Sequence, residues 1–206
     1  MVNKAHITSL LLLLSVLSGC ERKNVSSSTL EQRTAEIIEC YQGQMQEETV
    51  RSNLAKALEG DSLAEWKIGN LLLMAWTYSE ASKESEEARI LGNAWLLKSA
   101  EDGCPYAMLD LATHVNGTDD LAREKEDDLV RKGVALLKNK TDKDALDARY
   151  LSACYASGIG VKQDIRIAYK WYSRFVEMEK SIPEGQKEYL LEEWRKKHDV
   201  PPEVTN

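Results

Sequence analysis

Residues that could perform acid–base or metal chemistry are few and widely spaced in this sequence. Beyond the N-terminal twenty residues the histidines are His114, near the end of an expected helix beside Asn116, and His198, in a polar terminal helix. The chain has no H-x-x-x-H pair, no G-x-S-x-G motif and no Walker loop. We therefore expect no catalytic residue, no metal site and no cofactor, and predict that the protein is not an enzyme.

Two further motifs have a chemical and a structural interpretation, and the structural one is favoured for both. Gly158-Ile159-Gly160 resembles a phosphate-binding loop, but it lacks a preceding strand and a third glycine, so a turn between helices is expected. Adjacent acids on a helix point in different directions and usually form a solvated face. The pairs concerned are Glu86-Glu87, Asp119-Asp120, Asp127-Asp128 and Glu192-Glu193.

Three cysteines remain after Cys20, namely Cys40, Cys104 and Cys154, and their spacing fits no metal motif. In an oxidising compartment one pair could form a disulfide and leave one thiol over. Small buried thiols are an equally good interpretation, and the sequence does not decide between them.

Composition limits both the fold and the partners. Four prolines and a single phenylalanine, with abundant alanine, leucine and glutamate, indicate an all-α protein. Without residues 1–19, which contain Lys4, the chain has 26 basic and 34 acidic residues. This excess of negative charge disfavours nucleic acid and would steer a basic protein surface toward the chain.

The stretch from Asp144 to Phe175 predicts two short helices joined by a glycine corner. Leu151 and Tyr155 are four residues apart and share one helical face. Gly158 and Gly160 allow the positive φ angles of a sharp reversal, and Asp164 is placed to cap the second helix.

Equivalent apolar residues recur at about forty positions, which predicts stacked helical hairpins. Ile68 and Leu111 are 43 residues apart, and Leu111 and Leu151 are 40 apart. We therefore predict three hairpins, with flanking helices. The expected divisions are N-terminal helices at 30–60, repeats at 61–180, and a C-terminal capping helix and tail at 181–206.

The last hairpin resembles the Sel-one-like repeat, a relative of the tetratricopeptide repeat. The matching residues are Leu151, Tyr155, Gly158, Gly160, Val161, Asp164, Ala168, Trp171 and Tyr172, while Asp147 replaces an expected alanine. Weaker matches begin at Ala64 and Ala107. The resemblance implies an α/α solenoid of about three hairpins, in which Trp95 and Trp171 are packing residues.

The beginning of the chain resembles a bacterial lipoprotein signal. Residues 1–19 contain a short apolar run, and Leu17-Ser18-Gly19-Cys20 resembles a lipobox. The resemblance implies acylation of Cys20 and a polar tether at 20–29, although an ordinary signal peptide cut nearby is the alternative. Glu21, where an aspartate would retain the protein at the inner membrane, implies the periplasmic face of the outer membrane.

The repeat pattern fails in two stretches, and there we place the partner-binding residues. In Met74–Ala88, the irregular stretch, the candidates are Trp76, Tyr78 and Glu80; around Asn116–Asp128 they are Asp119 and Asp120. Exposed aromatic residues beside acids are common in protein interfaces. The alternative is that Trp76 and Tyr78 fold back onto the neighbouring unit.

These features predict a lipid-anchored module that binds a protein partner and takes no nucleic acid or small-molecule substrate. Resemblance to periplasmic Sel-one-like lipoproteins implies an immunity protein against a type VI secretion effector of the lipase type. An envelope adaptor or signalling regulator that binds an endogenous membrane protein is the second hypothesis. A cell-envelope hydrolase is a remote third, because no catalytic constellation supports it.

Overall fold

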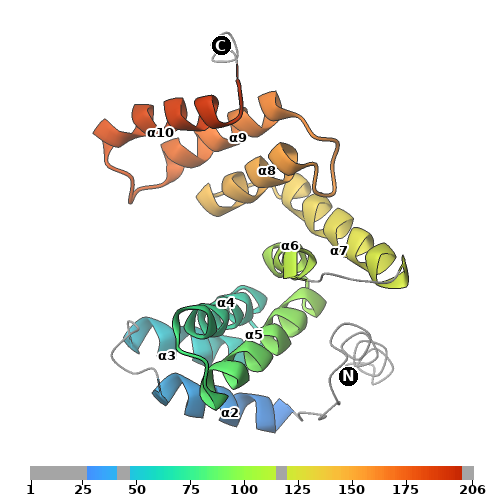
Figure 1. The fold of residues 1–206 in the computed structure, drawn as a ribbon, viewed down its shortest axis with the longest axis vertical. Helices are drawn as coiled ribbons and strands as arrows, with labels where there is room; N and C mark the ends of the chain where they lie inside the picture. Colours follow the sequence, from blue (N-terminus) through green and yellow to red (C-terminus); the bar gives the residue numbers. More distant parts are fainter. Residues whose placement is uncertain (1–26, 41–46, 115–119, 201–206) are drawn as a thin grey trace. The chain divides into compact units, whose positions relative to one another are not determined.

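In the computed structural model the described residues are 27–40, 47–114 and 120–200, and their regular elements are all α-helices (Figure 1). This confirms the predicted all-α class. The chain divides into two units, one ending at Glu126 and one beginning at Asp127, and each is described by itself. The expected signal peptide (1–19) and Cys20 lie outside the described residues.

The first unit contains five helices and the beginning of a sixth, α7 (Asp120–Asn139), among its described residues. The five are α2 (Ser27–Cys40), α3 (Glu47–Leu58), α4 (Ser62–Tyr78), α5 (Lys83–Glu101) and α6 (Pro105–His114). Helix α2 begins inside the segment expected to be a tether (20–29), so helical structure starts three residues earlier than predicted. No helix within the described ranges is both long enough and apolar enough to cross a bilayer.

The helices predicted to open the three repeats begin at equivalent positions. Helices α4 and α6 start at Ser62 and Pro105, and α8 (Ala145–Ser157) starts at Ala145. These starts are 43 and 40 residues apart, which are the spacings expected from the apolar pattern. The predicted repeat register is therefore present in the backbone.

Helices α4 and α5 form a hairpin whose axes approach closely at two glycines. A Cβ atom on Gly92 would lie 2.9 Å from the carbonyl oxygen of Gly69, and one on Gly69 would lie 3.0 Å from the carbonyl oxygen of Gly92. Only residues without a side chain allow the two backbones to come this close. Ile68, Leu72 and Trp95 fill the adjoining core, together with Ala64, Ala75, Ala88 and Leu91.

Helix α2 packs against α5 and seals this core. The indole Nε1 of Trp95, which is 1 % exposed, donates a hydrogen bond of 2.7 Å to Thr34 Oγ1. Ile37 of α2 belongs to the same buried cluster. Trp95 is thus a core residue, as the repeat pattern predicted.

Helix α6 is joined to α4 by an aromatic and polar contact. Trp66 Nε1 donates to Asp110 Oδ2 over 2.7 Å, and Asn70 Nδ2 donates to the same oxygen over 3.2 Å. The rings of Trp66 and Tyr106 lie 5.3 Å apart. Trp66 is partly buried.

The second unit repeats the hairpin construction with α8 and α9 (Ile165–Met178). Ser152 and Ala168 occupy the positions of Gly69 and Gly92, and Ser152 Oγ donates to the Ala168 carbonyl over 2.9 Å. The corner contains Gly158 at φ 73° and Gly160 at φ 66°, and Asp164 accepts hydrogen bonds from the first amides of α9. The predicted glycine corner and cap are confirmed.

Two helices flank this hairpin. Helix α7 (Asp120–Asn139) spans the boundary between the units, and its residues Val130 and Val134 lie against Gly160. Helix α10 (Glu184–Lys197) packs on α9 through Trp194, whose ring lies 5.7 Å from Tyr169 and 5.3 Å from Tyr172.

Candidate functional site

The tip of the α4–α5 hairpin brings together the residues predicted for partner binding in Met74–Ala88. Trp76 and Tyr78 occupy the last turn of α4, and Glu80 lies in the corner that follows. The sequence predicts an irregular stretch here, but α5 already starts at Lys83. Ser82 explains the early start, because its hydroxyl accepts from the Ser85 amide while the Ser85 side chain accepts from the Ser82 amide.

This hairpin is longer than its counterpart in the second unit, and the extra length lies at the tip. Helix α4 has 17 residues where α8 has 13. Trp95 is the thirteenth residue of α5, whereas the equivalent Trp171 is the seventh of α9. The extra residues therefore extend both helices by a turn or more beyond the core that the two hairpins share. This extension places Trp76 and Tyr78 away from that core.

Exposed aromatic and apolar side chains lie at the tip, and Tyr78 is the most exposed large apolar residue of the described hairpin. Tyr78 is 83 % exposed, Met74 is 58 % exposed and Trp76 is 41 % exposed. Tyr78 and Met74 are four residues apart, so they share one face of α4, while Trp76 lies on another. Of the two interpretations of these aromatics, the described structure favours exposure for Tyr78.

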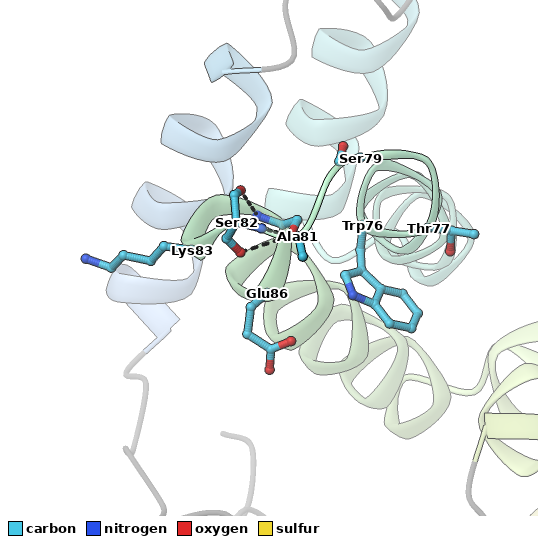
Figure 2. A pocket seen from close by; sticks show the side chains of 8 residues that line it. Trp76, Thr77, Ser79, Ala81, Ser82, Lys83 and Glu86 are labelled. Atoms are coloured by element: carbon cyan, nitrogen blue, oxygen red, sulfur yellow. Dashed lines mark hydrogen bonds between the residues drawn. The ribbon is translucent and has the colours of Figure 1, made fainter.

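Trp76 forms one wall of an open depression of about 700 Å³ at the tip. Figure 2 shows its indole projecting from the end of α4, across from Glu86 on the first turns of α5. The remaining lining consists of small polar residues, lysine and alanine: Thr77, Ser79, Ala81, Ser82, Lys83 and Ser85. Trp76 is therefore the one large apolar side chain among the residues that line this depression.

The tip carries more acidic than basic side chains. Glu86 is held by Arg89, whose Nε donates over 2.9 Å, and this bond is the main reason that the pKa of Glu86 is lowered. The pKa of Glu84 is also lowered, first by its own backbone amide and then by Ser82. Both carboxyl groups therefore stay ionised well into acidic solution, and Glu80 adds an exposed acid in the corner.

The side chains of the two candidates in the second predicted stretch lie outside what the structure describes. Asp119 lies outside the described residues, and Asp120 is the first residue of α7 with its side chain outside them. The same holds for the side chain of His114, at the end of α6. These predictions stay predictions.

The remaining residues that could take part in chemistry are packed against a ring or buried. His198 stacks on Trp194 with the ring centres 4.1 Å apart, and burial, followed by the charge of Lys197, lowers its pKa. Cys104 and Cys154 are free buried thiols, and burial raises the pKa of both, that of Cys154 to about 11. These thiols are therefore poor nucleophiles at neutral pH.

No group of three or more histidine, cysteine, aspartate or glutamate side chains within 27–40, 47–114 and 120–200 is arranged to hold a metal ion. Glu65 is fully buried and its Oε1 pairs with Lys98, while no hydrogen-bond partner for Oε2 occurs in the described part of the chain. A buried carboxylate with one fixed counter-charge anchors α4 to α5 and has no companion group for catalysis.

Two features of the tip were not predicted from the sequence. Met74 was not singled out, although its spacing from Tyr78 could have identified a shared exposed face. The close approach at Gly92 was also missed, because a glycine inside a helix reveals its role only when the neighbouring helix is known.

Comparisons with known proteins add no identity. No family model matches the chain, and neither the curated proteins nor the solved structures contain a significant match.

Proposed function

We propose that this chain is a non-enzymatic protein-binding module, and that the tip of the α4–α5 hairpin contacts its partner. The observation that carries this proposal is the exposure of Tyr78 and Trp76 on an extended helical corner that the equivalent hairpin of the second unit lacks. Tryptophan and tyrosine are enriched among the residues that dominate the binding energy of protein interfaces.

The tip is suited to a partner with a basic rim around an apolar centre. Trp76 and Tyr78 would supply the apolar contacts, and the acids Glu80, Glu84 and Glu86 lie on the same helical corner. Charge complementarity of this kind increases the rate of association more than the final affinity. The net charge of −7 for the whole chain acts in the same direction.

The sequence resemblances indicate where the protein would act and which kind of partner it would bind. A lipobox ending at Cys20 would anchor the chain to the periplasmic face of the outer membrane. The resemblance to Sel-one-like lipoproteins would make the partner a type VI secretion effector, neutralised when the bound module blocks its active site or its membrane-docking surface. A protein that acts by occlusion needs a shaped surface and no catalytic group, in agreement with the surroundings of His198 and the two buried thiols.

A photo-crosslinking experiment tests the role of the tip. A photoreactive amino acid would replace Tyr78 in the full-length protein, expressed in cells that also produce the proteins encoded by the neighbouring genes. The matched control places the same group at Tyr189, which is 62 % exposed in α10 of the other unit. We expect a crosslinked partner from position 78 only, and loss of its capture when Trp76 is also changed to alanine.

The identity of the captured protein separates the two function classes. A secreted effector, together with loss of resistance in cells carrying Trp76→Ala and Tyr78→Ala, would support an immunity protein. Capture of an endogenous membrane protein would favour the envelope adaptor or regulator. Equal crosslinking from positions 78 and 189, or none from either, would refute the tip as the binding site.

A further inference from the structure

The two complete hairpins carry the same surface on their second helices, but only one of these surfaces is covered. Trp95 of α5 and Trp171 of α9 are equivalent, and each has a cation three residues later near its ring. Lys98 Nζ lies 5.9 Å from the Trp95 ring centre, and Arg174 Cζ lies 5.2 Å from that of Trp171. The equivalence extends one turn back, where Leu91 corresponds to Ile167.

In the first hairpin this surface is buried under α2. Leu91 is 3 % exposed and Trp95 is 1 % exposed, and Thr34 of α2 accepts the indole hydrogen bond. Helix α2 supplies apolar residues from one face, and its ion pair with α5 joins its cation Arg33 to Glu87. Its acidic residues Glu31, Glu36 and Glu39 are exposed. An amphipathic helix is therefore the cover of this surface in the same chain.

In the second hairpin the equivalent surface has no such cover in the described structure. Ile167 is 37 % exposed and Met178 is 42 % exposed, and Trp171 between them is only half-buried. The other sides of α9 are used, since Ala168 faces α8 and Tyr169 packs on Trp194 of α10. We call the uncovered surface formed by Ile167, Trp171, Arg174 and Met178 the α9 face.

The α9 face differs in charge from the equivalent surface around Trp95, and this difference indicates which kind of partner it binds. Lys98 is held by Glu65 and by Asp102, the latter over 3.2 Å. The equivalent positions in the second hairpin are Ala148 and Met178, so both acids are missing. Arg174 accordingly has no carboxylate partner among the described residues.

The surroundings of the α9 face are also mainly basic. Lys143 Nζ lies 5.9 Å from the Trp171 ring centre, on the loop before α8. The exposed charged residues of α9 are Arg166, Lys170, Arg174 and Glu177. An apolar stripe with unpaired cations beside it fits a helix that brings both apolar side chains and carboxylates.

We propose that the α9 face binds an acidic amphipathic helix of a partner protein, seated on Trp171 as α2 is seated on Trp95. Apolar residues of that helix cover Ile167 and Met178, and one of its carboxylates pairs with the Arg174 guanidinium. This surface belongs to the second unit, so the proposal goes beyond the role given to the hairpin tip and stands without it.

A peptide that copies α2 provides a defined probe for the test. It has the sequence of residues 27–40 with serine for Cys40, a fluorescent label and a staple that keeps it helical. Its binding to the full-length acylated protein in detergent is measured by fluorescence anisotropy. We expect Trp171→Ala and Arg174→Gln each to weaken binding by about tenfold or more. Tyr189→Ala, in α10, should leave it unchanged.

A matched peptide and a measurement of the oligomeric state test the proposal further. A peptide with glutamine for its three glutamates should bind the unchanged protein more weakly and lose its sensitivity to Arg174→Gln. No binding at millimolar peptide, or equal binding to the protein with Trp171→Ala, would overturn the proposal. Concentration-dependent dimers in sedimentation that Trp171→Ala abolishes would overturn it too, because the occupant would then be a second copy of this chain.

Discussion

Replacing Gly92 by alanine should loosen the first hairpin, although alanine is ordinarily the better helix former. In an open helical position this change stabilises a protein by about 0.8–1 kcal/mol. At Gly92 the new methyl group would lie 2.9 Å from the backbone oxygen of Gly69 and 2.9 Å from Leu73 Cγ. The leucine can rotate away, but the backbone oxygen moves only if the two helices separate.

The size of the effect follows from these opposing contributions. Overpacking of a close contact costs about 1–3 kcal/mol, and a backbone contact belongs at the upper end of that range. After the gain in helix propensity, we expect a net loss of about 1–2 kcal/mol in the free energy of unfolding. For a chain of this size such a loss lowers the melting temperature by about 2–8 °C.

Gly185→Ala is the matched control, because Gly185 is helical and a Cβ atom there would meet nothing within 4 Å. Thermal melting followed by circular dichroism compares the two variants, and amide hydrogen exchange shows whether faster opening is confined to α4 and α5. We expect Gly185→Ala to melt at or slightly above the temperature of the unchanged protein. If Gly92→Ala did the same, with unchanged exchange in α4 and α5, the close approach of the two backbones would be refuted as a constraint.

Three further outcomes are expected from the structure. Gly160→Ala should destabilise the second unit by about 2–4 kcal/mol in denaturant unfolding, because φ is 66° and the new Cβ would lie 2.7 Å from Val130 Cγ1; a loss below about 1 kcal/mol would contradict this. Thr34→Val should cost about 1–3 kcal/mol by leaving the Trp95 indole N–H buried without an acceptor, whereas Thr34→Ser should cost less; equal losses would show that the hydrogen bond is unimportant. The pKa of Cys154 is raised to about 11, against 9.0 for a free thiol, so less of the reactive thiolate is present at any pH below 11. Alkylation of Cys154 at pH 8 should therefore be about 100-fold slower in the folded than in the unfolded chain, as mapped by mass spectrometry.

Local features of the fold could be predicted because short segments determine them. Positive φ at Gly158 and Gly160 follows from a reversal within a few residues, and the cap by Asp164 depends only on the next three amides. The recurrence at 43 and 40 residues is also readable, because buried first-helix residues such as Leu151 must keep their place in every hairpin.

The candidate site was located by its failure to match the pattern, but its structure was not predictable in that way. Met74–Ala88 lacks the glycine corner of the last hairpin, which indicated an irregular insertion rather than two extended helices. The paired caps of Ser82 and Ser85 restart the helix early, and serine at both positions is a weaker signal than the usual serine and glutamate. The exposure of Tyr78 depends on how far the arms reach, which only the three-dimensional arrangement shows.

The repeat pattern does not predict whether another helix packs over the second helix of a hairpin. Trp95 and Trp171 occupy the same repeat position, so the sequence predicts the same packing role for both. The first is sealed by α2, whereas the second is half-buried beside Arg174, which has no carboxylate partner in the described part of the chain. The difference arises from residues outside the motif: Glu65 and Asp102 in one hairpin become Ala148 and Met178 in the other. A hairpin that has lost the acids but kept the tryptophan and the cation retains the means to bind a helix that brings carboxylates to Arg174.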